Sequence, residues 1–140
     1  MMKQFSILSV VMVAIFSCQQ TVTSDDLAKI NGYWEIQKVT FPNGNEKEYT
    51  INESVDFFEL KNEEGFRKKL KPQFDGTFLV NNEQEQIQII DSAGVKYIYY
   101  NTKYDAWKEE IHALSDSILV LKNRDNTAYH YKRFIPFSLK

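Results

Sequence analysis

Residues 86–102 read QIQIIDSAGVKYIYYNT, and this stretch decides the fold class. Ile87 and Ile89 alternate with polar residues, a pattern typical of a strand with one face in a hydrophobic core. Ser92-Ala93-Gly94 is a turn sequence, after which the chain enters a second run of apolar and aromatic residues, Val95 to Thr102. Two such runs joined by a short turn indicate an antiparallel β-hairpin.

The same pattern of short apolar runs separated by turns continues on both sides of this hairpin. Turns at Pro42-Asn43-Gly44 and Asp75-Gly76 and an aromatic content of 14% favour strands throughout. Residues 106–114 also fit a helix, because Trp107 and Ile111 share a helical face, but a strand is the stronger interpretation. We therefore predict an all-β antiparallel sandwich or barrel, with strands at residues 34–41, 54–61, 65–73, 77–81, 86–91, 95–102, 106–114, 117–123 and 128–134.

The composition is that of one globular domain. The 140 residues are 43% hydrophobic and 26% charged, with a formal net charge of −2. Basic residues are scattered among acidic ones, so a nucleic-acid partner is not expected. A single Cys excludes an intrachain disulfide and a Cys-based zinc or iron–sulfur site. His112 and His130 are isolated and are expected to face solvent, so no metal or cofactor is predicted.

The N-terminus has the features of a lipoprotein export signal. Lys3 supplies a positive charge, and Phe5 to Phe16 is almost entirely apolar but too short to span a bilayer as a helix. The segment that ends at Cys18 resembles a lipobox, in which small and aliphatic residues precede a lipidated Cys. The resemblance implies a signal peptide at 1–17, and acyl chains such as palmitate on Cys18, which anchor the protein to a membrane. Gln19 after the Cys favours the outer membrane of the cell envelope, on its periplasmic or surface face.

A polar tether is predicted at residues 18–23, and the folded domain at residues 24–140. Ser24-Asp25-Asp26 has the pattern of a helix N-cap followed by acidic residues that complement the helix dipole. Leu27 and Ile30 would share one face of this short helix, which Asn31-Gly32 would end.

The residues that follow this helix carry a family resemblance. Asn31-Gly32-Tyr33-Trp34 resembles the Gly-x-Trp signature of lipocalins, in which the Trp closes one end of a β-barrel. In that family a basic residue of the last strand packs across the Trp, and Arg133 matches it by position. Asp75-Gly76, Tyr100-x-Thr102, Trp107-x-Glu109 and Tyr129-x-Tyr131-Lys132-Arg133 resemble small lipocalin-like lipoproteins of the Bacteroidota. The resemblance implies a single up-and-down barrel of about eight or nine strands, with Gly32, Trp34 and Arg133 as structural residues.

Some charged residues share strand parity with apolar ones. Asp56 alternates in step with Phe58, Lys68 with Phe66, and Glu109 with Trp107, so inward apolar side chains would place these charges inside. An edge or solvent-facing sheet would leave them in water instead. The other interpretation is a polar patch at a barrel mouth that orients a ligand. On that interpretation we expect Lys68 and Glu109 to meet, with ligand-binding contributions from Tyr97, Tyr99 and Tyr131.

These observations favour a membrane-anchored lipocalin-like lipoprotein that binds a small, partly apolar molecule. The alternative is a protein-interaction or inhibitor module whose barrel is filled by its own aromatic side chains. No nucleophile–base pair or phosphate-binding motif stands out in the sequence, so catalysis is not expected.

Overall fold

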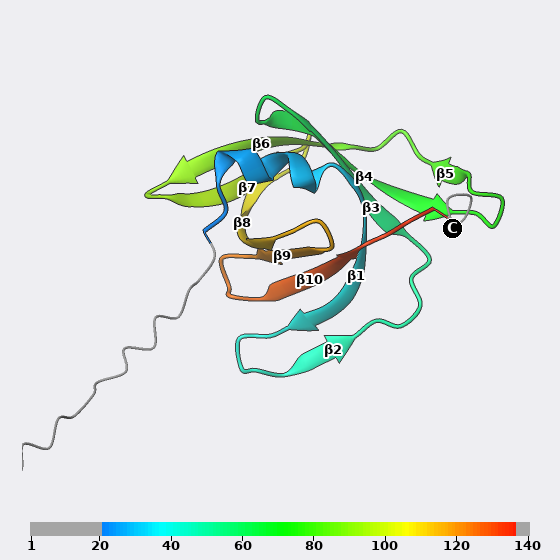
Figure 1. Ribbon diagram of the computed structural model, residues 1–140, viewed down its shortest axis with the longest axis horizontal. Helices are drawn as coiled ribbons and strands as arrows, with labels where there is room; N and C mark the ends of the chain where they lie inside the picture. The colour runs from blue at the N-terminus through cyan, green and yellow to red at the C-terminus, as the bar shows by residue number, and fades with distance from the viewer. Residues whose placement is uncertain (1–20, 137–140) are drawn as a thin grey trace, which may run out of the picture.

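The computed structural model describes residues 21–136, and almost all of its regular structure is antiparallel β-sheet (Figure 1). All nine predicted strands are present. The additional strand, β2, consists of three exposed charged residues and so lacks the apolar alternation that predicts a strand. The elements are η1 (Ser24–Ile30, a 3-10 helix), β1 (Gly32–Thr40), β2 (Glu46–Glu48), β3 (Val55–Lys61), β4 (Glu64–Pro72), β5 (Phe78–Val80), β6 (Glu85–Ser92), β7 (Val95–Asn101), β8 (Ala106–Leu114), β9 (Ile118–Lys122) and β10 (Ala128–Arg133).

Eight of these strands close into a barrel. Hydrogen-bonded neighbours follow the order β10-β9-β8-β7-β6-β4-β3-β1, and β10 also pairs with β1, so that the sheet closes on itself. Every pairing in this ring is antiparallel. β2 pairs with the end of β1, and β5 with the end of β4, outside the ring. The predicted single antiparallel up-and-down barrel is confirmed, and residues 106–114 form a strand rather than a helix.

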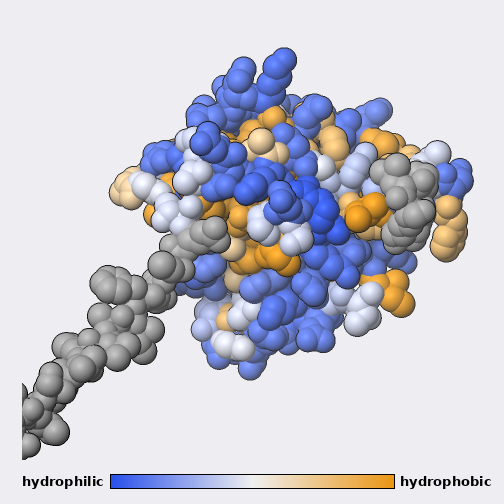
Figure 2. Space-filling model, viewed as in Figure 1, coloured by the Kyte–Doolittle hydropathy of each residue, from blue (hydrophilic) through white to orange (hydrophobic). Residues whose placement is uncertain are grey.

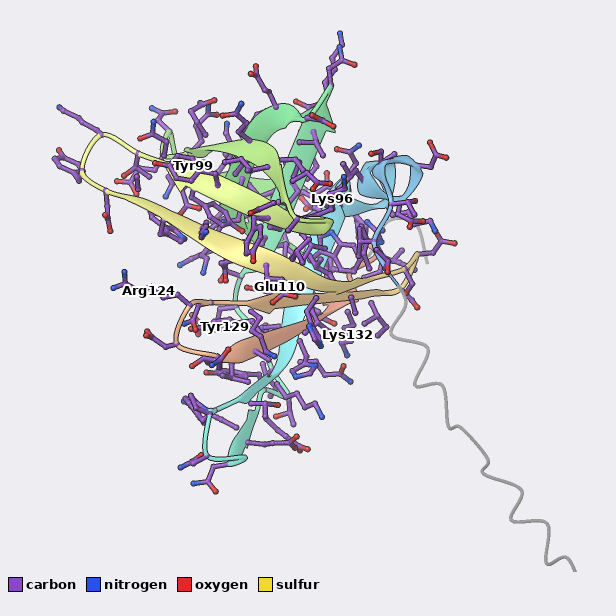
Figure 3. All side chains as sticks on the ribbon, turned by 90° about the vertical axis from the view of Figure 1, so that its left-hand side faces the viewer. Lys96, Tyr99, Glu110, Arg124, Tyr129 and Lys132 are labelled. Atoms are coloured by element: carbon purple, nitrogen blue, oxygen red, sulfur yellow. The ribbon has the colours of Figure 1, made fainter. Side chains whose placement is uncertain are left out.

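The two ends of the barrel carry different structures. At one end, named the closed end, η1 lies beside the turns at residues 93–94 and 115–117 (Figure 3). At the other, named the open end, lie the turns at residues 102–105 and 123–127. The longer connections that contain β2 and β5 also emerge at the open end, because β1 and β4 both run towards it.

Trp34 and Arg133 seal the closed end. Trp34 is fully buried, and its indole Nε1 donates a 2.8 Å hydrogen bond to the carbonyl oxygen of Ile30. Arg133 is the register partner of Trp34, and its guanidinium carbon lies 3.8 Å from the centroid of the Trp34 ring. Gly32 has a φ of +118°, which residues with a Cβ rarely adopt, and a Cβ there would also lie 2.9 Å from a guanidinium nitrogen of Arg133, so glycine suits this position. The predicted contact between Trp34 and Arg133 is confirmed.

The helix η1 is capped one residue earlier than the sequence suggested. Thr23, not Ser24, is the N-cap residue. The Asp26 carboxylate accepts hydrogen bonds from the backbone N–H and the hydroxyl of Thr23, at 3.0 and 2.9 Å. These bonds, together with the Lys29 ammonium, lower the pKa of Asp26 to about 2. Leu27 and Ile30, which were predicted to share one face of the helix, are both buried and pack into the core at the closed end of the barrel.

Apolar side chains fill the half of the barrel next to the closed end. They come from every strand of the ring except β4, and most are fully or almost fully buried, so this half is a packed core rather than a cavity. This core contains Leu27, Ile30, Trp34, Phe58, Ile87, Ile89, Ile98, Tyr100, Ile111, Leu119, Leu121 and Tyr131.

A second apolar cluster, named the outer aromatic cluster, lies on the outside of β1, β3 and β4. Tyr33 stacks on Phe78 of β5 at 4.8 Å between ring centroids and contacts Phe57 at 4.9 Å. Phe57 in turn contacts Phe66, and Phe78 contacts Phe134. β5 and the segment after β10 therefore cover this outer face, where Figure 1 shows the C-terminal segment running beside β5. Phe66 thus points outward, which sends its neighbour Arg67 inward.

The predicted signal peptide at 1–17, the lipidation site Cys18 and the first residues of the tether lie outside the described residues. Within residues 21–136, no helix has the length and apolar character that a membrane span requires.

Candidate functional site

Three adjoining pockets hollow the open end of the barrel. Their volumes are about 990, 350 and 290 Å³, and Asp56 of β3 and Lys69 of β4 line all three. The largest pocket is bounded by the residues that link β4 to β6, including Leu79 and Val80 of β5, and by the turn at 102–105. The smallest is lined by nearly buried side chains of β8 and β10, Glu109 and Tyr131, and we name it the deep pocket. Because they share residues, we describe the three together as the mouth pocket.

Arg67 lies between the mouth pocket and the apolar core. Its guanidinium carbon is 4.4 Å from the centroid of the Tyr100 ring and 5.9 Å from that of Phe58. Its Nε and Nη2 both contact Glu85 Oε2, at 2.6 and 2.5 Å, and its Nη1 lies 3.8 Å from Glu109 Oε1. Burial alone would lower the pKa of Arg67, but Tyr100, Asp56 and Glu85 around it hold that pKa above its ordinary value. Arg67 is therefore a permanent buried cation in the barrel.

Two carboxylates face the mouth pocket from nearly buried positions. Residues Asp56 and Glu109 each expose only 8% of their surface. Burial raises the pKa of Glu109, and the charges of Asp56 and Glu85 add to this rise, whereas Tyr100 and Arg67 oppose it. The Tyr100 hydroxyl lies near Glu109 but does not reach the geometry of an ordinary hydrogen bond. At the pocket floor, the Tyr100 hydroxyl is thus a buried polar group without a hydrogen-bond partner among the described residues.

Aromatic side chains form much of the wall around these carboxylates. Trp107 of β8 stacks on Tyr100 with 5.1 Å between ring centroids and lines the deep pocket. Tyr129 and Tyr131 of β10 line both the deep pocket and the 350 Å³ pocket, and Tyr131 is almost fully buried. Burial raises the pKa of Tyr131 far above the physiological range, so its hydroxyl stays a hydrogen-bond donor.

The structure brings together two of the five residues predicted to bind a ligand. Glu109 and Tyr131 both line the deep pocket. Lys68 does not meet Glu109, and that prediction is wrong. Lys68 is the register partner of Phe57, and its ammonium lies 5.6 Å from the centroid of the Phe66 ring, on the outside of the barrel.

Tyr97 and Tyr99 also lie outside the barrel. They alternate with the buried Ile98 and Tyr100, and Lys108 places its ammonium 4.6 Å from the centroid of the Tyr97 ring. Figure 3 shows Tyr99 on β7 and, across the barrel, Tyr129 on β10 beside the turn that carries Arg124. Tyr97 and Tyr99 therefore contribute nothing to the wall of the mouth pocket.

Sequence reasoning missed Arg67, Glu85 and Lys69 as residues of the pocket. The alternation of β4 misled the assignment of its inward face. Phe66 and Leu70 are apolar and were expected to point inward, but Phe66 packs against Phe57 in the outer aromatic cluster, so this face of β4 points outward. The one available signal was the register with β3. Pairing of inward Phe58 with Arg67, and of Asp56 with Lys69, places both cations on the interior side.

The two histidines do not form a second candidate site. His112 Nδ1 lies 3.6 Å from Glu110 Oε1, and His130 Nε2 lies 3.1 Å from the Thr40 hydroxyl. Both histidines are partly buried rather than fully solvent-facing, and burial lowers the pKa of His130. No group of three His, Cys, Asp or Glu side chains within residues 21–136 has the arrangement of a metal site. The arrangement at the open end suits binding of a small molecule that offers both polar and apolar groups.

No protein-family model matches the chain, and no curated protein shows significant sequence similarity to it. Among solved structures, it is similar to a lipocalin-like protein from Bacteroides uniformis, with 15% identity and a TM-score of 0.47 over 76% of this chain and 99% of the other. It is also similar to an uncharacterized protein from Bacteroides eggerthii, with 11% identity and a TM-score of 0.46 over 74% and 98% of the two chains. The fold assignment itself stands on the strand pairing. The chain is a lipocalin-like barrel, with eight antiparallel strands closed by β1 and β10 and with Trp34 and Arg133 at its closed end.

Proposed function

We propose that this protein binds a small, partly apolar molecule in the mouth pocket, without catalysing a reaction on it. The observation that carries the proposal is the division of the barrel interior. One half is a packed apolar core, and the other is an open pocket lined by Asp56, Arg67, Glu109 and aromatic rings. A pocket of about 990 Å³ with two side pockets has the size of a small-molecule site.

We further propose that Cys18 carries a lipid anchor and that the protein is held at the outer membrane of the cell envelope. The described chain enters the barrel at its closed end, through Thr21, Val22 and η1. Residues 18–23 span at most about 20 Å when extended. An anchor at Cys18 would therefore keep the closed end near the membrane and leave the open end accessible to solutes.

Native mass spectrometry of the full chain, purified from its own cells, tests the binding function. The expected result is a bound species of defined small mass. Ser54→Trp should remove it, because Ser54 lines both the largest pocket and the 350 Å³ pocket and the indole would fill the space between them. Ser92→Trp is the matched control, since Ser92 is exposed at the other end of the barrel.

A specific observation favours one other function, the binding of a protein partner. Ile51, Leu79 and Tyr104 expose 88%, 61% and 87% of their surface on connections at the open end. Figure 2 shows hydrophobic side chains gathered at the end of the molecule where β5 lies. If purification yields a stable complex with a protein and no small molecule, and Ser54→Trp leaves that complex intact, the protein-interaction alternative replaces the proposed function.

A further inference from the structure

The charges at the floor of the mouth pocket do not balance. Arg67 and Glu85 form a close pair, with two contacts of 2.6 and 2.5 Å to one carboxylate oxygen, and so largely neutralise one another. Glu109 lies 3.8 Å from the same guanidinium, outside hydrogen-bond distance. Asp56 lies 3.9 Å from the ammonium of Lys69. Neither Asp56 nor Glu109 therefore has a cation within hydrogen-bond distance among the described residues, because Arg67 is already paired with Glu85 and Lys69 is too far away.

The unequal exposure of these charged groups increases the effect of the charge imbalance. The Asp56 and Glu109 side chains are 11% and 10% exposed, whereas the Lys69 side chain is 69% exposed. Water screens the Lys69 charge strongly and the two carboxylates weakly. Lys69, Lys71 and Lys103 line the largest pocket, but at the floor an incoming cation would meet two weakly screened carboxylates, which an incoming anion would have to approach.

The surroundings of the carboxylates also suit a cation with an apolar body. Trp107, Tyr129 and Tyr131 line the same deep pocket of about 290 Å³, and aromatic faces attract cations. The Tyr100 hydroxyl, which is fully buried and has no hydrogen-bond partner among the described residues, lies beside Glu109. A pocket that combines two carboxylates with aromatic walls suits amines and guanidines.

We infer that the ligand of the mouth pocket is a small organic cation, a primary amine or a guanidine, whose charged group binds between Asp56 and Glu109 while its apolar part packs against Trp107, Tyr129 and Tyr131. This inference rests on the proposed function. It selects one ligand chemistry for a pocket that could otherwise hold any small molecule.

Three probes of equal shape and different charge test the inference. They are 2-phenylethylamine, 2-phenylethanol and phenylacetate, titrated into the full chain by calorimetry, with Trp107 fluorescence as a second signal. We expect the amine to bind at least tenfold more tightly than the alcohol, and phenylacetate to bind most weakly. The preference for the amine should fall at least tenfold in Glu109→Gln and in Asp56→Asn, both close isosteres.

Glu110→Gln supplies the matched control. Glu110 follows Glu109 on the same strand, faces the outside of the barrel beside His112, and is labelled in Figure 3. This variant removes the same charge from the same strand and should leave binding of the amine unchanged. Circular dichroism of each variant establishes that the barrel is folded.

The outcomes separate this inference from the proposed function. Equal binding of amine and alcohol, tighter binding of phenylacetate, or an unchanged amine affinity in both folded isosteric variants would overturn the cation inference and leave small-molecule binding intact. Absence of binding by all three probes at millimolar concentration would also overturn it. Absence of any co-purifying small molecule in native mass spectrometry would remove the proposed function as well.

Discussion

Replacement of Arg133 by Met tests how the closed end is held together. Met keeps the unbranched aliphatic stem of Arg but removes the guanidinium. In the native barrel this group donates hydrogen bonds to the carbonyl oxygens of Asp116, Asn31 and Lys29, at 2.9, 2.6 and 2.5 Å. It also stacks on Trp34 at 3.8 Å. One side chain thus ties β10 to the turn before β9 and to the end of η1.

The cost follows from these contacts. A hydrogen bond from a charged donor contributes about 1.5–3 kcal/mol when buried. The Arg133 side chain is partly exposed, so water can replace much of each bond, and about 1 kcal/mol for each of the three is the appropriate scale. The stacking on Trp34 adds about 0.5–2 kcal/mol. We expect Arg133→Met to lower the free energy of unfolding by roughly 2–4 kcal/mol, less than a simple sum because the contacts are coupled.

Equilibrium urea unfolding, followed by far-ultraviolet circular dichroism, measures this change. Arg124→Met is the control, because Arg124 is exposed on the turn before β10 and its loss should alter stability by no more than about 0.5 kcal/mol. A double-mutant cycle with Trp34→Leu, which leaves no aromatic ring beside residue 133, measures the coupling between the two side chains, for which we expect about 0.5–2 kcal/mol. The reasoning fails if Arg133→Met costs no more than the Arg124 control, or if the Trp34–Arg133 coupling energy is zero.

Three further predictions concern other parts of the chain. Cys18→Ala should move the protein from the membrane to the soluble fraction; continued membrane partitioning with an unchanged mass shift in mass spectrometry would refute the anchor. Because burial raises the pKa of Glu109, the stability contributed by its protonated form is complete below the unfolded pKa of about 4.3 and lost as pH rises through the folded pKa. The stability difference between the native chain and Glu109→Gln, from urea unfolding between pH 4 and 8, should therefore shift against the native chain as pH rises; a flat difference would contradict this. Gly65→Ala should lower the free energy of unfolding by about 3 kcal/mol or more, because its Cβ would lie 1.8 Å from the Glu59 carbonyl oxygen. Gly44→Ala, where a Cβ meets nothing within 4 Å, should cost only the strain of Ala at a φ of +87°, about 1–2 kcal/mol, and equal costs in urea unfolding would contradict this.

The architecture was predictable because most strands of this barrel follow simple rules. β6 alternates apolar and polar residues, β7 is a short apolar and aromatic run, and a turn sequence separates them, so their positions could be read directly. The contact at the closed end was predictable because Gly32-x-Trp34 and a basic residue near the end of the last strand can be recognised from residue type and position alone. β2 could not be predicted, because its three exposed charged residues lack the apolar alternation that marks a strand.

The pocket was only partly predictable, for a physical reason. Parity identifies two faces of a strand, but it assigns the inward face only when one side is clearly more apolar. β4 has apolar residues on the outside, where β5 and Phe134 cover them, and cations on the inside. Glu109 was placed correctly because β8 has no such cover and its apolar residues do face the core.

The pairing of β10 with β1 has a consequence for how the chain acquires its structure. The first and last strands of the ring are about a hundred residues apart, and their register joins Trp34 to Arg133. A chain that emerges from the ribosome from its N-terminus cannot make this junction until its final segment is available. Contacts between such distant residues form late, since the entropy of closing so long a loop must be overcome first. The barrel consequently cannot close before its last strand has left the ribosome.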